Sequence, residues 1–327
     1  MQFTIVGAGA LGTILGGHLL AAGHGVTMIA RGARLQQIKT EGLRLSGLKP
    51  MIVPCVAVDP GTPIAEPGIV IFTVKTYQMR AALAALAQLR PEAVFSVANG
   101  VLKNEQLAAA YGIEVVLGCM ANVSGELLPS GTVDFTRNVC MPLGALAGYC
   151  GPDPLAIAAI VDAAGVVTAA VADIETVEWS KFVGWLAMFT LAVIARATTG
   201  VLLEHPRLAA VGVGIVREAA AIAAARGIAL VDQSPIPVVT VSTAPLPVAV
   251  EKLRDIGRHL LAQAPSHRMS SLQDLAAGRV LEVDETLGYA VSEAARLGLA
   301  VPTLALCYNL VAGLNDVARA GALSPNT

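Results

Sequence analysis

The sequence predicts an α/β protein: an N-terminal, Rossmann-type doubly wound sheet followed by an all-helical C-terminal domain. A glycine-rich turn, Gly7-x-Gly9-x-x-Gly12, lies between an apolar strand and a helical pattern. Continuous apolar strands then alternate with helical segments, as in a parallel sheet covered on both faces. From residue 174 the pattern is helical almost throughout. We therefore expect two domains, residues 1–172 for a dinucleotide and residues 173–327 for a substrate or a dimer contact.

Composition narrows the function classes. The 327 residues carry a net charge of −2, which argues against nucleic acid or an anionic membrane surface as a partner. Hydrophobic residues make up 55% of the chain, which raises the question of a membrane span. The longest apolar run, residues 182–195, is too short to span a bilayer and indicates a buried core helix. Because the apolar N-terminal segment lacks a basic leader, we do not interpret it as a signal peptide, and we expect a cytoplasmic protein.

The cysteines and histidines indicate no metal site. The five cysteines are an odd number without a C-x-x-C pair, so we expect reduced, buried thiols and no disulfide framework. The histidines show no ligand spacing, and we expect His259 and His267 to be surface residues. The expected metal content is therefore none.

The glycine-rich turn is the dinucleotide-binding fingerprint when it follows a strand and opens a helix. Residues 3–6 have the pattern of a buried strand, and residues 10–22 that of a helix that stops at Gly23. The three glycines allow a tight turn, a close approach of a pyrophosphate and close packing of the helix on the strand. A merely glycine-rich turn is the weaker alternative. We expect the cofactor to be bound by Gly7, Ala8, Gly9, Ala10, Leu11 and Gly12.

The residues after the second strand indicate which dinucleotide is bound. NAD enzymes place an acidic residue there to hold the ribose 2′-hydroxyl. Here the strand expected at residues 26–30 is followed directly by Arg31. Arg34 comes three residues later, and no acidic residue lies between the two arginines. Guanidinium groups suit a 2′-phosphate, so we expect NADPH; the alternative is that both arginines are solvated charges.

Two further strands end in polar residues. Residues 68–74 form a continuous apolar run before Lys75, and residues 93–97 form another shortly before Asn99. Ligands of doubly wound sheets lie outside the carboxyl ends of the strands, so both residues are site candidates by position. The alternative for each is an ordinary loop residue.

The remaining elements follow from the same patterns. In the first domain we expect short strands at 43–46, 52–58, 114–117 and 166–171 and a hairpin formed by 131–136 and 139–144. We expect one helix that follows Gln78 and ends near residue 89, and two more at 104–111 and 154–164. In the second we expect helices at 175–196, 207–226, 248–262, 280–297 and 304–318, a proline-rich loop after Gly227 and a frayed tail at 323–327.

Several stretches together resemble the ketopantoate reductases (2-dehydropantoate 2-reductases). The segment Gln-Asp-Leu-x-x-Gly-Arg-x-x-Glu-x-Asp is the most specific of them, and the order and spacing of all of them extend over nearly the whole chain. They are residues 7–12, 31–32, 74–78 and 99–101, Lys181, and residues 270–275, 278–279, 282–284 and 298–302.

The resemblance implies NADPH bound in the Rossmann domain and a 2-keto acid bound in a cleft against the helical domain, where it is reduced to the 2-hydroxy acid. The family reaction converts ketopantoate to pantoate, in pantothenate biosynthesis. Lys181 matches the catalytic lysine that hydrogen-bonds the keto oxygen and supplies its proton, and Glu282 matches the glutamate that orients it. Asn99 matches an asparagine near the nicotinamide and substrate, and Ser270 a serine that holds the substrate carboxylate. On the cofactor side the resemblance assigns Arg31, Lys75, Asn99 and Glu282.

The roles of the lysine and glutamate also make chemical sense without the family. Hydride attack on a ketone builds an alkoxide, which a nearby ammonium stabilises and protonates. A carboxylate such as Glu282 would offset the cost of burying that ammonium and keep it charged. The alternative for Lys181 is an ordinary lysine on a helix surface.

Departures from the family bear on the substrate. The family carries asparagines one and two turns after the catalytic lysine, where this chain has Trp185 and Phe189, and two further asparagines are replaced by Thr199 and Leu287. A site without those polar groups cannot discriminate for a hydroxyl. Trp185 and Phe189 share a helix face with Lys181, so we expect them to line a pocket for a bulkier 2-keto acid, or else to be core packing.

Three functions remain open. The first is reduction of ketopantoate, the second reduction of a more hydrophobic 2-keto acid, and the third sensing of NADPH without turnover, with imine reduction as a variant chemistry. The apolar second domain is compatible with a homodimer, but buried core helices would give the same pattern, so the oligomeric state stays open.

Overall fold

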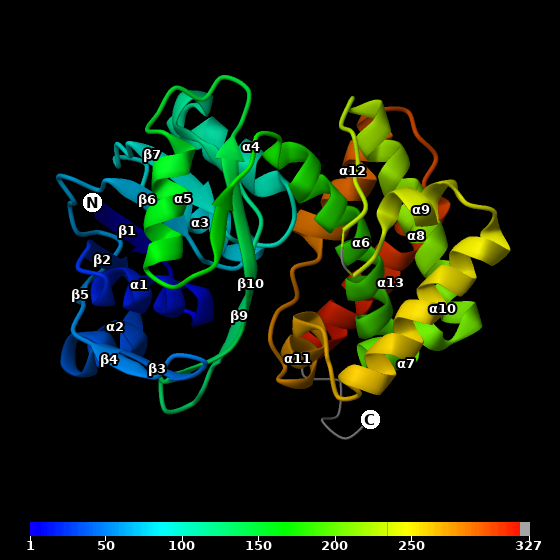
Figure 1. Ribbon diagram of the computed structural model, residues 1–327, viewed down its shortest axis with the longest axis horizontal. Coiled ribbons are helices and arrows are strands. Elements are labelled where there is room, and N and C mark those ends of the chain that lie inside the picture. Colours follow the sequence, from blue (N-terminus) through cyan, green and yellow to red (C-terminus); the bar gives the residue numbers. More distant parts are fainter. Residues whose placement is uncertain (234, 321–327) are drawn as a thin grey trace. The chain divides into compact units, whose positions relative to one another are not determined.

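The computed structural model describes residues 1–233 and 235–320, and the chain divides into two compact units, Met1–Glu178 and Trp179–Thr327. The first unit contains the sheets and the second is built from helices (Figure 1). The predicted fold class is confirmed. The boundary expected after residue 172 stays a prediction.

The main sheet is parallel and has the strand order β5-β2-β1-β6-β7. Its strands are β1 (Gln2–Val6), β2 (Gly25–Ile29), β5 (Val56–Val58), β6 (Ile69–Phe72) and β7 (Ala93–Ser96). From β1 the chain first adds strands on one side and then, with β6, on the other. The carboxyl ends of β1 and β6 therefore form the switch point, where such sheets bind their ligands.

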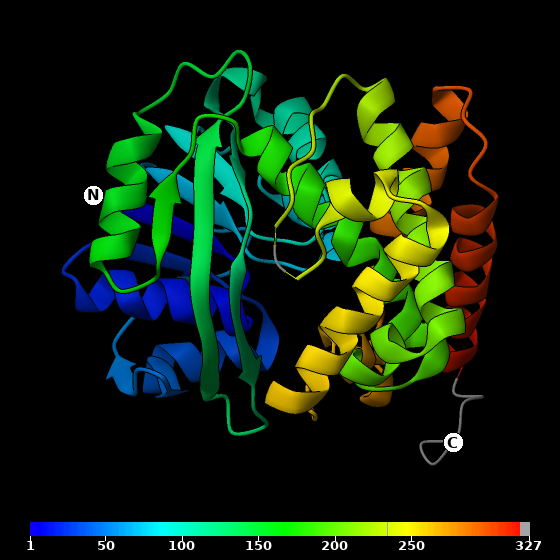
Figure 2. The ribbon, with the colours of Figure 1, turned by 45° about the vertical axis from the view of Figure 1, so that its right-hand side comes forward.

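The second sheet is centred on a long strand, β10 (Val133–Ala145), and Figure 2 shows β9 (Asn122–Leu127) beside it. The other strands are β3 (Leu43–Gly47), β4 (Met51–Val53), β8 (Leu117–Cys119) and β11 (Thr168–Ala170). The predicted hairpin is wrong, because both of its halves belong to β10 and the antiparallel partners are β8 and β9. Register shifts near Phe135 and Asn138 break the alternation of β10, which imitates a turn in the sequence. The strand expected at 114–117 is a 3-10 turn, η1 (Ile113–Val115), followed by β8.

Helix α1 (Ala10–Ala21) lies between the two sheets, since it contacts β1 and β2 of one and β3, β9 and β10 of the other. This explains why its residues are apolar on every side. A Cβ atom at Gly16 would lie 2.9 Å from side-chain atoms of both Leu43 and Met28, so a larger residue there would force these side chains to shift. The other helices of this unit are α2 (Gly32–Glu41), α3 (Thr76–Ala85), α4 (Leu102–Tyr111) and α5 (Pro154–Ala163).

The helical unit follows the predicted order with four differences. The expected proline-rich loop contains a short helix, and a further short helix follows the longest one. A third unpredicted helix spans Ser270–Ala276, and the helix expected at 280–297 begins as a π-helical turn. The elements are α6 (Ile174–Ala195), α7 (Thr199–Glu204), α8 (Pro206–Ala225), α9 (Val238–Thr243), α10 (Leu246–Gln263), α11 (Ser270–Ala276), η2 (Asp284–Gly288), α12 (Tyr289–Arg296) and α13 (Pro302–Arg319). The tail at 323–327, expected to be frayed, lies outside the described residues.

Helices α6 and α8 are long and apolar enough to cross a membrane by composition alone. In α6, however, 83% of the apolar window is buried inside the protein, which is the behaviour of a core helix. The value for α8 is 44%, so part of its apolar surface remains exposed. Such helices are weak evidence for a membrane span.

The cysteines form no disulfide among the described residues. Cys119 and Cys307 are buried and Cys55 and Cys140 half-buried, whereas Cys150 is exposed, so the expectation that every thiol is buried is wrong for Cys150. Burial raises the pKa of the Cys55 thiol to about 11, which keeps it protonated and unreactive at neutral pH.

Candidate active site

The three glycines of the first turn differ in their surroundings. Gly7 has φ +107, and a Cβ atom there would lie 2.8 Å from Cγ1 of Val74. At Gly12 a Cβ atom would lie 2.0 Å from the carbonyl oxygen of Gly7, so the start of α1 touches the turn itself. At Gly9 a Cβ atom would meet none of the described atoms within 4 Å. The turn is thus closed on its inner side and open at Gly9, where a pyrophosphate fits.

Helix α1 begins directly after Gly9, and the first hydrogen bond of the helix runs from Thr13 N to the Gly9 carbonyl, at 3.0 Å. The amide groups of the first turn therefore point outward at the positive end of a twelve-residue helix. A phosphate group is the ligand that such an end favours. The turn and the helix start together fit the diphosphate of a dinucleotide.

Thr73, which the sequence analysis did not single out, holds this turn in place. It follows β6 directly, and its hydroxyl donates to the carbonyl oxygen of Gly7 at 2.6 Å, while its backbone amide donates to Val6 at 2.9 Å. The contact joins the ends of β1 and β6 at the switch point. Its position directly after an apolar strand was the only signal in the sequence.

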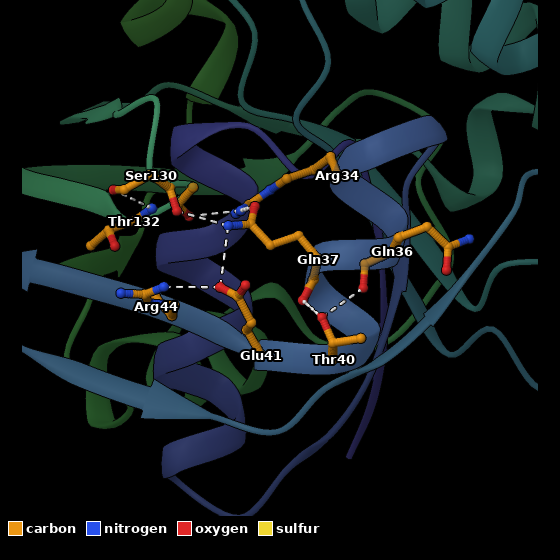
Figure 3. Close-up of polar contacts among 9 residues, drawn as sticks. Arg34, Gln36, Gln37, Thr40, Glu41, Arg44, Ser130 and Thr132 are labelled. Atoms are coloured by element: carbon orange, nitrogen blue, oxygen red, sulfur yellow. Dashed lines mark hydrogen bonds and ion pairs between the residues drawn. The ribbon is translucent and has the colours of Figure 1, made fainter.

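The two arginines after β2 differ sharply. Arg34 is half-buried: its Nε donates to the carbonyl of Ala8 at 2.9 Å, and its Nη2 donates to the Thr13 hydroxyl at 2.8 Å. Its Nη1 donates to the carbonyl of Gly131 at 2.7 Å and to Gln37 at 2.8 Å (Figure 3). Burial lowers the pKa of the Arg34 guanidinium, against the opposing effect of Glu41.

Arg34 is therefore neither a solvated charge nor available for a phosphate, because its hydrogen bonds tie α2 to the fingerprint turn and to the residues before β10. Arg31 precedes α2 and is exposed. The interpretation of the two arginines as a pair is wrong for Arg34. Of the two, Arg31 is the candidate for the 2′-phosphate.

Lys75 and Asn99 lie at the carboxyl ends of the neighbouring strands β6 and β7, as expected from the sequence. Lys75 precedes α3, and its backbone amide donates to the side chain of Gln78 at 3.2 Å. Asn99 lies in the loop between β7 and α4, where Gly100 has φ +79 and so requires glycine. Both side chains are partly exposed.

In the helical unit, α6 carries Lys181, Trp185 and Phe189 at successive turns. Lys181 is half-buried. The rings of Trp185 and Phe189 are stacked, with centroids 4.7 Å apart and an interplanar angle of 24°. Trp185 is 7% exposed and Phe189 1% exposed, so Phe189 in particular is packed among neighbours.

Glu282 is buried, with 5% of its surface exposed, and its backbone is held on both sides. The amide of Leu281 donates to the side chain of Asn315 at 3.0 Å, and the hydroxyl of Thr286 donates to the carbonyl of Glu282. A π-helical turn, η2, follows directly, and such turns are frequent at functional sites. Ser270 is the exposed first residue of α11.

The most specific sequence motif has a structural part. Nε of Arg279 donates to Asp274 at 2.7 Å, the Arg279 amide donates to the Asp274 carbonyl at 2.8 Å, and Gly278 between them has φ +66. This contact closes the C-terminal end of α11. The motif therefore fixes the chain between Ser270 and Glu282.

The other two positions that depart from the family are also buried. Thr199 is 1% exposed and its hydroxyl lies 2.9 Å from Nδ1 of His267, while Leu287 is fully buried in η2. His267 is consequently half-buried and bonded, and the expectation of a surface residue is wrong for it. Thr199 and Leu287 are thus both packed among neighbouring side chains.

Two family models match most of the chain. "Ketopantoate reductase PanE/ApbA" matches residues 3–148, and "Ketopantoate reductase PanE/ApbA C terminal" matches residues 173–315. The chain belongs to the ketopantoate reductase family. As a member of this family it is an oxidoreductase that acts on a CH–OH group and binds a nicotinamide cofactor.

Relatives of this reductase cover it almost completely. The 2-dehydropantoate 2-reductase of Archaeoglobus fulgidus is 29% identical and covers 95% of this chain and 97% of its own. The crystal structure of a PanE/ApbA family ketopantoate reductase from Ralstonia eutropha JMP134 is 26% identical, with a TM-score of 0.81 and coverage of 98% and 100%. D-mandelate dehydrogenase, solved with NADH and anilino(oxo)acetate, is 21% identical with a TM-score of 0.82 and coverage of 97% and 99%. At that identity the likeness to the dehydrogenase shows the fold alone.

Proposed function

We propose that this reductase uses NADPH to convert a 2-keto acid to the 2-hydroxy acid, with ketopantoate as the substrate and pantoate as the product. The observation that carries the proposal is the open cradle at Gly9, at the switch point of a chain that matches the family over both units. The Archaeoglobus relative bears the name of this activity. Residues of the family's catalytic pattern, Lys181 and Glu282, are present in this chain.

We infer the preference for NADPH from the end of β2. The chain has no acidic residue there to hold a ribose 2′-hydroxyl. Strand β2 ends at Ile29, Ala30 follows, and Arg31 comes next with an exposed side chain. Arg34 donates its hydrogen bonds to Ala8, Gly131 and Thr13 of the protein itself. We therefore assign the guanidinium that binds a 2′-phosphate to Arg31. Lys75 adds a second positive charge after β6, which β1 separates from β2 in the sheet.

In the proposed mechanism Lys181 and Glu282 do the acid–base work. When bound, the nicotinamide supplies the hydride that adds to the keto carbon. The ammonium of Lys181 donates a hydrogen bond to the keto oxygen, stabilises the negative charge that develops there and then transfers a proton to it. Glu282 keeps Lys181 charged before the reaction. Asn99 orients the nicotinamide and substrate, and the hydroxyl of Ser270 donates to the substrate carboxylate.

A bulkier 2-keto acid is the second candidate substrate, because the stacked pair Trp185 and Phe189 offers aromatic surface where the family has amides. Since Phe189 is almost fully buried, we assign the substrate contact to Trp185 and treat Phe189 as its support. Loss of the amides removes hydrogen bonds that would select a hydroxylated substrate.

A panel of keto acids with both cofactors tests these proposals. We expect kcat/KM with NADPH to exceed that with NADH by about 10- to 100-fold, the value of one charge-assisted phosphate contact. Equal use of both cofactors would refute the role of Arg31. A clear preference for ketopantoate over branched and aromatic keto acids would refute the role of Trp185, and oxidation of NADPH by none of them, with NADPH still bound, would support a sensor.

We also infer a cytoplasmic location, since the five cysteines of the described residues form no disulfide. Formation of a homodimer stays a prediction. Sedimentation of the purified protein over a range of concentrations measures it directly, and a constant monomer mass would contradict it.

A further inference from the structure

A buried ion pair lies beside the loop that carries Asn99. Lys103 is in the first turn of α4, with its side chain 4% exposed, and its Nζ lies 3.1 Å from Oε1 of Glu178 in α6. The start of a helix disfavours a positive charge, so Lys103 occupies an unfavourable position unless it meets a partner. Glu178 is that partner, and its side chain is 2% exposed.

Every donor of the Lys103 ammonium has an acceptor. Besides Glu178, Nζ donates to the carbonyl of Ala98 at 3.0 Å and to the carbonyl of Cys119 at 2.6 Å. Ala98 directly precedes Asn99, and Cys119 ends β8. The ammonium therefore ties the backbone of the Asn99 loop to the neighbouring strand.

Both oxygens of the Glu178 carboxylate also accept hydrogen bonds. Its Oε1 accepts the backbone amide of Cys119 at 3.0 Å, and its Oε2 accepts Nδ2 of Asn104 at 2.6 Å. Space for it comes from Gly118, where a Cβ atom would lie 2.9 Å from Oε2. The N-terminal part of α6, the loop after β7, α4 and β8 thus meet at one charged pair.

Stability alone does not account for this network. Burying two charges costs desolvation energy that their attraction often only offsets, and apolar replacements of a buried pair are often neutral or stabilising. The network does something that an apolar pair cannot do, because it fixes the direction of the Ala98 carbonyl. That carbonyl belongs to the peptide group shared with Asn99, so its direction sets the course of the loop.

We propose that Lys103 and Glu178 are positioning residues of the reductase, which hold the Ala98–Asn99 peptide so that Asn99 meets the nicotinamide in the reactive orientation. This rests on the proposed function of Asn99. Small misplacements of a positioning group reduce turnover strongly while leaving binding energy nearly intact. The pair therefore acts on hydride transfer and leaves the phosphate cradle at Gly9 untouched.

The test replaces both charges at once, in Lys103→Met/Glu178→Leu. We expect a folded protein with a lower melting temperature, because the carbonyls of Ala98 and Cys119 lose their charged donor. We expect a Kd for NADPH within about twofold of the native value, because the cradle is intact. We expect kcat to fall about 10-fold or more, and the primary isotope effect with deuterated NADPH to rise, because hydride transfer becomes slower. An unchanged kcat and isotope effect in a folded double variant would overturn the proposal.

A second double variant, Lys103→Gln/Glu178→Gln, keeps side-chain hydrogen bonds without charge. It should recover part of the lost kcat, and it carries the test if the apolar variant fails to fold. The matched control is Arg258→Gln/Asp255→Asn, an exposed ion pair on α10, for which we expect native kcat. A kcat for Lys103→Gln/Glu178→Gln no higher than that of the apolar variant would count against a role for these hydrogen bonds.

One readout is independent of the reaction. In the native protein NADPH should slow hydrogen exchange of the amides at 99–101, and in the apolar double variant this protection should be lost while NADPH still binds. If the native enzyme reduces no keto acid, the proposed function fails, yet this measurement still decides the role of the pair. Equal protection in both proteins would contradict it.

Discussion

The fingerprint turn at 7–12 and the aromatic part of α6 are both expected to face ligands, yet they are built in opposite ways. In the turn Gly7 and Gly12 answer steric demands of the fold, and Gly9 leaves open space where a ligand fits. In α6, Trp185 and Phe189 fill the space themselves and stack on each other. A backbone cradle thus keeps its shape whatever binds, whereas an aromatic pocket depends on how its side chains repack.

This difference predicts how each region responds to substitution. Changes in the cradle should affect every dinucleotide-dependent property in the same way. Changes on α6 should separate turnover from cofactor binding. The following substitutions test that division, beginning with the largest expected effect.

The largest effect should come from Lys181→Ala. Loss of the group that donates a proton should lower kcat by about 10²- to 10⁴-fold while NADPH binding is retained. Steady-state kinetics and fluorescence titration with NADPH measure the two quantities. Lys252→Ala, at an exposed position on α10, is the matched control. A similar fall in kcat for Lys252→Ala would show that the loss of any positive charge lowers kcat, and that the effect is not specific to Lys181. A native kcat for Lys181→Ala would remove this residue from the mechanism.

Two alanine substitutions in the cradle should fail for different reasons. In Gly12→Ala the new Cβ would meet the carbonyl of Gly7 at 2.0 Å, so we expect a loss of about 3 kcal/mol in the free energy of unfolding as well as weaker NADPH binding. Gly9→Ala adds its methyl group to open space at φ −76, so the fold should keep its stability. Its Kd for NADPH should still rise at least about tenfold, because the methyl group occupies the place of the pyrophosphate. Tight binding by Gly9→Ala would mean that the cofactor does not approach this turn.

The two arginines after β2 should separate specificity from structure. Arg31→Ala should remove most of the preference for NADPH over NADH, by about 10- to 100-fold, without changing stability. Arg34→Ala should leave the preference unchanged and cost about 2 kcal/mol or more, because the carbonyls of Ala8 and Gly131 lose a charged donor. Thermal unfolding and the ratio of the two Kd values measure these effects. Loss of the preference for NADPH in Arg34→Ala, with the preference kept in Arg31→Ala, would mean that Arg34 binds the phosphate.

The sequence was sufficient for the features that depend on local backbone geometry. The strands of the main sheet, the fingerprint turn and the strand ends at Lys75 and Asn99 were all predicted, because glycine spacing and apolar runs encode them directly. The hairpin within β10 was wrong because bulges imitate turns. The role of Arg34 and the pair Lys103–Glu178 were missed because they depend on residues far apart in the chain, such as Gly131 and Cys119, which no local pattern connects.

The smallest expected effect is the pH dependence of stability that arises from His18 in α1, between the two sheets. His18 is buried, with Nδ1 2.9 Å from the carbonyl of Ala164, and Nε2 has no hydrogen-bond partner among the described residues. Burial lowers the pKa of His18 below 6.5, with Lys49 adding to the effect and the Ala164 carbonyl opposing it. A proton therefore binds the unfolded chain first. The free energy of unfolding should fall as the pH drops from 6.5 toward the lowered pKa, and above 6.5 His18 should have no effect.

Urea unfolding as a function of pH measures this effect, with His18→Gln as the comparison. The variant should lose less stability than the native protein on acidification, since it has no proton to accept at this position. Parallel pH dependence in the two proteins would show that His18 has the same pKa in the folded and unfolded states, and would contradict the lowered pKa.

Transfer of hydride in a single turnover tests the central claim most directly. The enzyme would be loaded with NADPH that carries deuterium at the reactive position and mixed with excess ketopantoate, and the product identified by mass spectrometry. Reduction of the keto acid predicts pantoate with one deuterium at the carbon that bore the keto oxygen. Bound NADPH that keeps its deuterium with ketopantoate and with every bulkier keto acid would contradict the assignment as a keto acid reductase.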